Sequence, residues 1–151
     1  MKSPEVHFPP PFLYAGIFLL GFLLDRLVPV PELPRSPARI LSVVLLLPGL
    51  GLTFWSLWLF LRARTSPLPM RPATALVRSG PYRWTRNPMY LGLLLLYLGV
   101  ALLFDVTWAL VLAPLVVLLV GRLVIRREER YLEERFGAEY RRYQGEVRRW
   151  I

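Results

Sequence analysis

Four uncharged apolar blocks divide the sequence. They run over residues 8–24, 40–61, 88–104 and 106–121. A helix needs about 20 mostly apolar residues to cross the hydrocarbon core of a bilayer, and a backbone in lipid must satisfy its own hydrogen bonds. The pattern therefore predicts an all-α integral membrane protein, a single domain over residues 1–151 with about four transmembrane helices at about 8–28, 39–62, 88–104 and 106–125.

The segments between and after these blocks are polar. Residues 62–87 form a loop, and the last two blocks are joined by a tight turn at Phe104, Asp105 and Val106. Residues 126–150 are amphipathic, with large apolar side chains at three- or four-residue spacing, which predicts helices that Gly137 ends or bends. Because the last two spans form a hairpin, the loop and the C-terminal helices are expected to emerge on one side and face each other across a pocket.

Charge and residue counts restrict the function. The formal net charge is +9, and arginines gather in the loop and in the C-terminal segment, which the positive-inside rule places in the cytoplasm. Basic residues beside anionic lipid headgroups explain this charge better than nucleic-acid binding does. The chain has no cysteine and a single histidine, His7. These counts exclude a cysteine nucleophile and a histidine-rich metal site, and we expect no metal.

Two polar stretches carry candidate chemistry. "SGPYRWTRNPMYLG" at 79–92 combines arginines with aromatic residues, and "RREERYLEERFG" at 126–137 places two carboxylates directly after the fourth block. Structural roles are open for both: a helix-starting Pro88, interfacial Trp84 and Tyr90, and glutamates that pair with the loop arginines. The glutamates could equally hold a cationic or hydroxylated ligand.

The two stretches together resemble the isoprenylcysteine carboxyl methyltransferase family, which is related to the membrane phospholipid N-methyltransferases. The similarity covers roughly residues 72–150. The family's pattern is a Gly-x-Tyr, an Arg-His-Pro-x-Tyr-x-Gly, a Glu-Glu pair and a Phe-Gly-x-x-Tyr, and this chain matches it except for Asn87 at the histidine. It implies an enzyme of the inner or cytoplasmic membrane. Its cofactor S-adenosylmethionine would bind at the cytoplasmic face, and its acceptor would be a membrane lipid or a lipidated carboxylate that enters from the bilayer.

The resemblance also implies roles for individual residues. Those that match the family's cofactor-binding positions are Thr74, Ala75, Leu76, Val77, Tyr82, Asn87, Pro88, Met89, Tyr90 and Glu128. Glu129 and Arg126 are the candidate catalytic residues, with Arg122 an alternative to Arg126 for contact with the acceptor. Replacing Glu128 or Tyr90 by alanine is expected to weaken cofactor binding strongly, and replacing Arg149 to do little.

One departure from the family bears on the acceptor. The family usually has histidine where this chain has Asn87, and an asparagine forms hydrogen bonds but takes up no proton. A carboxylate acceptor is already ionised and needs no base, whereas an amine must first lose a proton. We therefore expect a carboxylate or thiol-like acceptor, with a lipid-amine N-methyltransferase as the alternative. An NADPH-dependent membrane reductase and a non-catalytic membrane module are further alternatives.

Overall fold

The computed structural model describes residues 6, 8–31 and 33–151, so His7 lies outside the described residues. Within this part of the chain all regular elements are helices, as predicted. They are α1 (Pro10–Leu27), α2 (Arg35–Arg62), η1 (Gly80–Arg83), α3 (Pro88–Leu103), α4 (Thr107–Val111), α5 (Ala113–Val120), η2 (Gly121–Ile125), α6 (Arg126–Phe136) and α7 (Ala138–Glu146).

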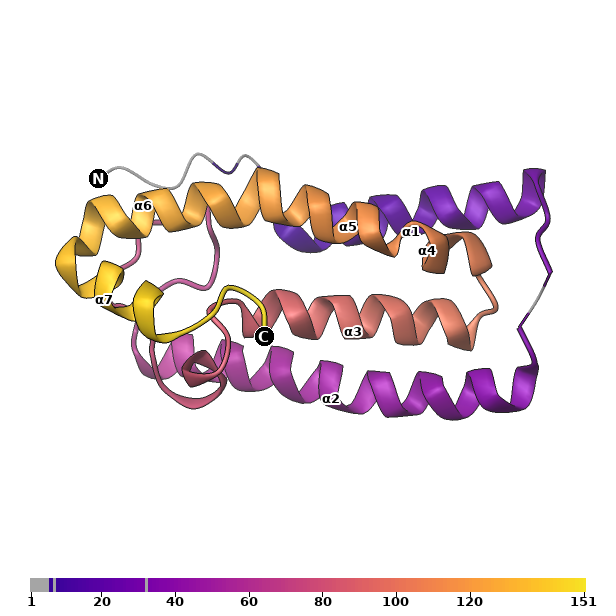
Figure 1. The fold of residues 1–151 in the computed structure, drawn as a ribbon, viewed down its shortest axis with the longest axis horizontal. Helices are drawn as coiled ribbons and strands as arrows, with labels where there is room; N and C mark the ends of the chain where they lie inside the picture. The colour runs from indigo at the N-terminus through magenta and orange to yellow at the C-terminus, as the bar shows by residue number, and fades with distance from the viewer. Residues whose placement is uncertain (1–5, 7, 32) are drawn as a thin grey trace.

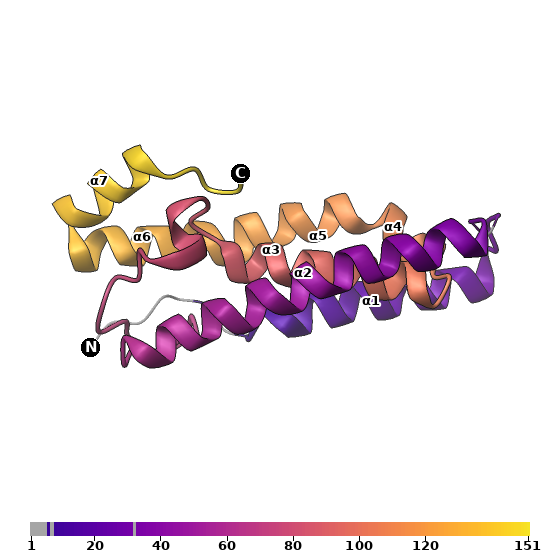
Figure 2. The same cartoon turned by 90° about the horizontal axis from the view of Figure 1, so that it is seen from below.

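The long helices run side by side in an elongated bundle (Figure 1). The chain passes along the bundle four times in alternating directions: through α1, α2, α3, and then α4 to α6 (Figure 2). The turn from α3 into α4 falls at Asp105, as predicted, with a φ of 54°. Loop 63–87, α6 and α7 consequently gather at one end of the bundle, where the polar residues lie.

Two described helices are long and apolar enough to span a membrane. They are α1, with 18 residues, and α2, with 28, whereas α3 is an apolar helix of 16 residues. The outer face of α2 exposes Ile40, Leu47, Phe54 and Leu61, each to more than 60%. A large apolar face of this kind is typical of a surface that meets lipid.

The last pass differs from the predicted span followed by separate helices. Helix α4 ends at Val111, because Pro114 has no N–H to continue the hydrogen-bonding ladder. From Ala113 the chain stays helical to Phe136, through the single π-helical turn η2. Gly137, with a φ of 52°, ends α6 as the sequence indicated. Residues 147–150, expected in a helix, lie beyond the end of α7 because Val147 is extended.

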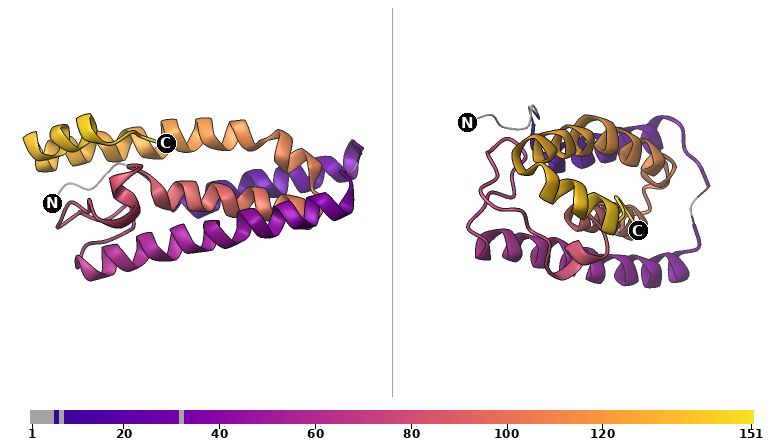
Figure 3. Two further views of the ribbon diagram at one scale, coloured as in Figure 1. Left: turned by 60° about the horizontal axis from the view of Figure 1, so that its bottom comes forward. Right: turned by 60° about the vertical axis from the view of Figure 1, so that its left-hand side comes forward.

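Close packing joins α2 to α3, which lie side by side (Figure 3). A Cβ atom added at Gly92 would lie 2.5 Å from Thr53 Oγ1 and 2.9 Å from the backbone oxygen of Gly49. A Cβ added at Gly99 would lie 2.7 Å from a carbon of Leu46. Small residues let helix backbones approach closely in membranes. Here they fix the position of α3, whose first turn carries the candidate site residues Pro88, Met89 and Tyr90.

Gly92→Ala should therefore destabilise the bundle. The added methyl group has no space between α3 and α2, and overpacking costs about 1–3 kcal/mol. We expect a lower midpoint of thermal unfolding in detergent. Gly51→Ala on α2 is the control, because its added Cβ would meet nothing within 4 Å. Equal midpoints for the two variants would contradict the packing argument.

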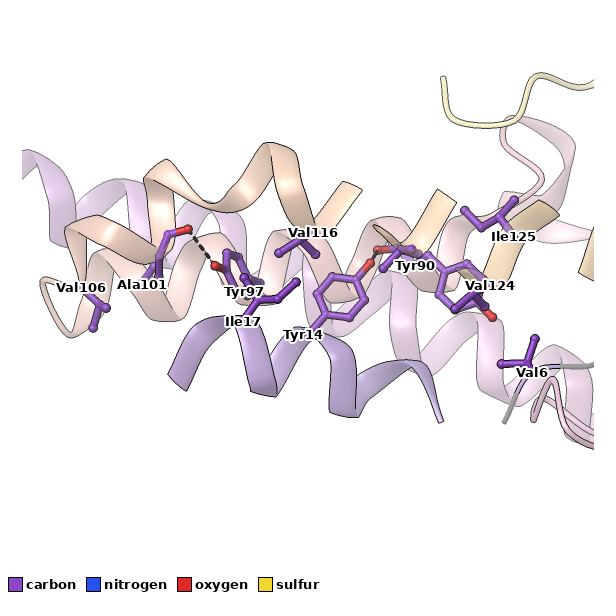
Figure 4. Close-up of a cluster of buried hydrophobic side chains, with 12 residues drawn as sticks. Val6, Tyr14, Ile17, Tyr90, Tyr97, Ala101, Val106, Val116, Val124 and Ile125 are labelled. Carbon is purple, nitrogen blue, oxygen red and sulfur yellow. Dashed lines mark hydrogen bonds between the residues drawn. The ribbon is translucent and has the colours of Figure 1, made fainter. Parts of the chain in front are cut away.

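A buried cluster ties α1 and α4 to α3 (Figure 4). The Tyr14 hydroxyl donates a hydrogen bond of 2.9 Å to the backbone oxygen of Tyr90, and the Tyr97 hydroxyl donates one of 2.8 Å to the backbone oxygen of Ala109. Val124 and Ile125 of η2 belong to the same cluster. The first turn of α3 and the start of α6 are thus held by one core.

Candidate active site

A cavity lies at the polar end of the bundle, between loop 63–87, the first turn of α3, α6 and α7. It is open on one side and is lined mainly by apolar and aromatic side chains with a few polar groups, a composition typical of small-molecule sites. The structure brings most of the predicted site residues to its wall. These are Ala75, Leu76, Val77, Tyr82, Asn87, Met89, Tyr90, Glu128 and Glu129.

Three predicted residues lie outside the lining. The Thr74 hydroxyl donates to the backbone oxygen of Arg64 at 3.0 Å, so its side chain holds the loop together. Pro88 is fully buried as the first residue of α3. Arg126, the first residue of α6, has an exposed side chain. The alternative candidate Arg122, in η2, is exposed as well. Neither arginine faces the cavity.

Glu128 is held by the first turn of α3. Its Oε1 accepts a hydrogen bond of 2.7 Å from the Tyr90 hydroxyl. Burial raises the pKa of Glu128 from 4.5 to about 7; the hydrogen bond from Tyr90 opposes the rise, and the charge of Glu129 adds to it. Glu128 is therefore poised to change its charge near neutral pH, and the lining of the cavity offers it no basic partner as close as Tyr90.

Glu129 occupies a different electrostatic position. Its two oxygens accept hydrogen bonds from Arg149, at 3.0 Å from Nε and 2.5 Å from Nη2. Arg86 Nη1 lies 3.3 Å from Glu129 Oε1. The buried carboxylate of Glu129 thus contacts two arginines, Arg86 of loop 63–87 and Arg149 near the C-terminus. This geometry favours Glu128 over Glu129 as the carboxylate that meets a ligand.

Aromatic side chains form the remaining wall. The rings of Phe60 and Tyr82 meet edge to face at 5.7 Å, and burial raises the pKa of the Tyr82 phenol well above its ordinary value. The Tyr143 hydroxyl donates to the backbone oxygen of Tyr82 at 2.7 Å. The Tyr131 hydroxyl accepts a hydrogen bond of 2.9 Å from the Ala73 N–H. Tyrosines of α6 and α7 therefore hold the loop in place.

Residues 147–151, here named the C-terminal strap, lie across the motif. The backbone oxygen of Arg148 accepts from the Arg86 N–H at 2.9 Å. The backbone oxygen of Arg149 accepts from Thr85 Oγ1 at 3.1 Å and from Asn87 Nδ2 at 2.8 Å. Trp150 packs against the core cluster. Asn87, the residue that departs from the family histidine, is thereby an anchor for the strap.

The pairing of the glutamates with loop arginines, left open from the sequence, occurs between Glu129 and Arg86, whereas sequence reasoning missed the strap contacts. Arg149 was expected to matter little, yet it makes a two-point contact with Glu129. Tyr140 and Tyr143 lay in the apolar periodicity of the C-terminal segment, and they line the cavity rather than only packing. Tyr140 is almost fully buried, and this burial raises the pKa of its phenol to about 12. The quoted Phe-Gly-x-x-Tyr pattern was the one signal that could have found it.

Asn87→Ala should loosen the strap, whereas Asn87→His should keep it closed. Alanine removes the donor to the Arg149 carbonyl, a loss of about 1 kcal/mol. A histidine ring N–H can donate in its place. We expect tryptic release of the C-terminal residues to be about fivefold faster for Asn87→Ala, followed by mass spectrometry. The same rate for wild type and Asn87→Ala would show that the contact contributes nothing.

Comparisons with known proteins place these residues in a family. A sequence model of the phospholipid methyltransferase family matches residues 37–139. An uncharacterized protein of Haemophilus influenzae is 44% identical over 63 residues, which cover 42% of this chain and all of that protein. The Saccharomyces cerevisiae Protein-S-isoprenylcysteine O-methyltransferase is 40% identical over 72 residues, 48% of this chain.

The match to the yeast enzyme covers about 30% of that enzyme's length. No solved structure gives a significant match to the chain. Among the described residues, no group of three or more histidine, cysteine, aspartate or glutamate side chains could hold a metal ion. The family match covers more than half of the sequence, and it includes all but the first two residues of α2, the stretch 79–92, α3 and the glutamate pair. The chain therefore belongs to the phospholipid methyltransferase family.

Proposed function

We propose that this protein is an integral membrane methyltransferase that uses S-adenosylmethionine and acts on a lipid or lipidated carboxylate acceptor. The observation that carries the proposal is the cavity in which the motif tyrosine Tyr90 meets Glu128. Buried titratable groups with displaced pKa values cluster at functional sites. The resemblance to the yeast O-methyltransferase supports the choice of acceptor.

The residues of the cavity fit the chemistry of this cofactor. S-adenosylmethionine has a flat adenine ring, ribose hydroxyls and a cationic methionyl part. Phe60 and Tyr82 offer apolar aromatic surface, and Glu128 offers a partly buried acceptor for hydroxyl or ammonium groups. The backbone of residues 75–77 lies at the wall, where it can approach the cofactor closely. We assign cofactor binding to these groups, with Tyr90 orienting Glu128.

The chain's own contribution to catalysis is alignment. When bound, the cofactor supplies a methyl group on a positively charged sulfur, which retains the carbon–sulfur electron pair as the acceptor oxygen bonds the methyl carbon. An ionised carboxylate needs no proton transfer, so the protein has to hold the two reactants in line and exclude water. The tyrosines of α6 and α7, which fix loop 63–87, provide this rigidity.

The proposed topology has four spans, with the cavity facing the cytoplasm. The second pair of spans would consist of α3 and the α4 to η2 segment, and the acceptor would enter between them from the bilayer. Arg122 and Arg126 are exposed on the same continuous helix and lie outside the cavity, so they are suited to meet anionic headgroups of the surrounding bilayer. Because the native chain has no cysteine, an Arg141→Cys variant can be labelled specifically. An impermeant maleimide should label it only in inside-out vesicles, and labelling in right-side-out vesicles would reverse the topology.

A lipid-amine acceptor is the alternative that one observation favours. An amine must lose a proton before it attacks, and a base with a pKa near 7 is suited to remove it. Glu128 has this property. In this reading Glu128 takes the proton from the ammonium group of a lipid, and the methyl carbon forms a bond to nitrogen.

Two measurements test the proposal. We expect calorimetric titration of the purified protein in detergent to give saturable one-to-one binding of S-adenosylmethionine and none of NADPH. Incubation with the labelled methyl donor and membrane lipids should then give a labelled lipid. Alkali hydrolyses a carboxyl methyl ester but leaves an N-methyl group intact, so alkaline treatment distinguishes the two acceptors.

The remaining functions predict other results. Binding of NADPH alone would indicate a membrane reductase and overturn the proposal. Binding of neither ligand, with or without added lipid, would indicate a non-catalytic membrane module.

A further inference from the structure

Arg86 has an unusual environment in the wall of the cavity. Its side chain is 12% exposed, and its Nε and Nη1 groups are buried without a hydrogen-bond partner. Its nearest acid is Glu129, at 3.3 Å from Nη1, in a contact that is an ion pair but not a hydrogen bond. Buried donors are nearly always satisfied in folded proteins, so these N–H groups call for an acceptor.

Glu129 does not supply that acceptor: its oxygens accept hydrogen bonds from Arg149, and Arg86 Nη1 lies at ion-pair distance from Oε1 without the geometry of a hydrogen bond. The three side chains therefore contain two positive charges and one negative charge. Glu128, the other acid of the cavity, is directed to Tyr90. Arg86 thus shares one carboxylate with Arg149 at a largely buried position, and the phenol of Tyr140, which also lines the cavity, is its other polar neighbour.

The position of Arg86 is fixed by its neighbours. Its own N–H donates to the backbone oxygen of Arg148, and the adjacent residues Thr85 and Asn87 both bind the backbone oxygen of Arg149. A guanidinium held in this way is pre-organised for an oxyanion, because its planar N–H groups match the oxygens of a carboxylate or phosphate.

We propose that Arg86 binds an acidic group of a ligand in this cavity, with Glu129 and Arg149 as positioning residues. The inference rests on the proposed function, which offers two sources of an oxyanion. One is the methionyl carboxylate of the cofactor, and the other is the acid group of the lipid acceptor. Arg86 and Glu128 then bind different ligand groups: Arg86 binds a negatively charged group, and Glu128 binds a positively charged group or hydroxyls.

The cofactor arm of the test compares S-adenosylmethionine with its decarboxylated form, which differs by the carboxylate alone. If Arg86 binds the cofactor, the wild-type protein should bind S-adenosylmethionine about a hundredfold more tightly than the decarboxylated form. Arg86→Gln should remove this difference. Arg83→Gln is the matched control, because Arg83 is exposed in the same segment and outside the cavity.

The acceptor arm uses two lipid probes, N-acetyl-S-farnesylcysteine and vesicles of phosphatidylethanolamine. If Arg86 binds the acceptor, Arg86→Gln should leave the affinities for both cofactor forms unchanged. It should raise KM for the methylated probe about tenfold or more, with a smaller change in kcat. Arg86→Lys, which keeps the charge without the planar fork, should lie between wild type and Arg86→Gln. Thermal unfolding in detergent checks that each variant is folded.

The proposal is overturned if Arg86→Gln changes neither the cofactor discrimination nor KM. It is also overturned if Arg86→Gln weakens both cofactor forms equally, since that result would indicate a structural role only. If neither lipid is methylated, the cofactor arm decides alone. Failure of the wild-type protein to bind S-adenosylmethionine would be a different result, because it would remove the proposed function itself.

Discussion

At pH 8, Glu128→Gln is expected to weaken the binding of S-adenosylmethionine by about 10- to 100-fold. Hydrogen bonds to a charged group contribute about 1.5–3 kcal/mol, and each 1.4 kcal/mol is about tenfold in affinity. Glutamine keeps the size of the side chain and its hydrogen bond with Tyr90, but it has no charge. Glu134→Gln is the control, because it changes the same charge at an exposed position of α6.

The difference in affinity between Glu128→Gln and wild type should narrow as the pH falls. With a pKa of about 7, Glu128 is about 90% ionised at pH 8 and about 10% ionised at pH 6, so its contribution to affinity falls about tenfold. The variant is compared with wild type at each pH, so the cofactor's own titration cancels. A difference that stays constant from pH 6 to pH 8 would contradict the role of an ionised Glu128.

The raised pKa of Glu128 also affects folding: as the pH rises, its contribution to stability falls while its contribution to cofactor affinity grows. Because the pKa of Glu128 is raised above its ordinary value of 4.5, the folded protein keeps a proton that the unfolded chain loses. This contribution to stability is fully present below pH 4.5 and is lost as the pH rises through 7. Ligand-free protein is therefore expected to lose the contribution of Glu128 over the pH range in which it gains affinity for the cofactor.

The second large effect is expected at Glu129. Glu129→Ala leaves Arg86 and Arg149 without their shared carboxylate, and removing one partner of a buried ion pair costs about 3–5 kcal/mol. The Arg149 side chain is 40% exposed, which favours the lower value, about 3 kcal/mol. For a chain of this size we expect the thermal midpoint to fall by about 6–12 °C, measured by circular dichroism in detergent.

Glu133→Ala provides the comparison for this loss of stability. Glu133 also lies on α6 and pairs with an arginine, Arg141, at 3.7 Å, but both side chains are about half exposed. Exposed pairs contribute about 0–1 kcal/mol, so its midpoint should barely change. Similar midpoints for the two variants would show that the buried position of Glu129 has no special importance.

The parts of the fold that follow local patterns could be predicted from the sequence. The absence of charge over each block indicated the helices, Asp105 marked the turn between α3 and α4, and Gly137 marked the end of α6. The hairpin then implied that the loop and the glutamate pair lie on the same side. The cavity that they share follows from chain order and needs no knowledge of individual contacts.

Features that depend on contacts between distant residues could not be predicted in this way. The spacing of Tyr143, Val147 and Trp150 suits a helix, yet the chain becomes extended at Val147. The strap's backbone oxygens instead bind Thr85, Arg86 and Asn87, some sixty residues away. The π-helical turn η2 also has no local sequence signal, because its residues suit an ordinary α-helix equally well.

The helix that continues from Ala113 to Phe136 keeps the site close to the bilayer, so the acceptor concentration that sets the rate is the concentration within the bilayer and not that in bulk water. Glu128 lies three residues beyond Ile125, the end of the predicted span, which is about 4.5 Å along a helix. Under the proposed function, an acceptor dissolved in the bilayer can then reach the cavity without entering bulk water. We expect the initial rate to follow the mole fraction of acceptor in the vesicle surface. Diluting the acceptor with inert lipid should slow the reaction. Adding more vesicles of the same composition, once all enzyme is bound to vesicles, should leave the rate unchanged.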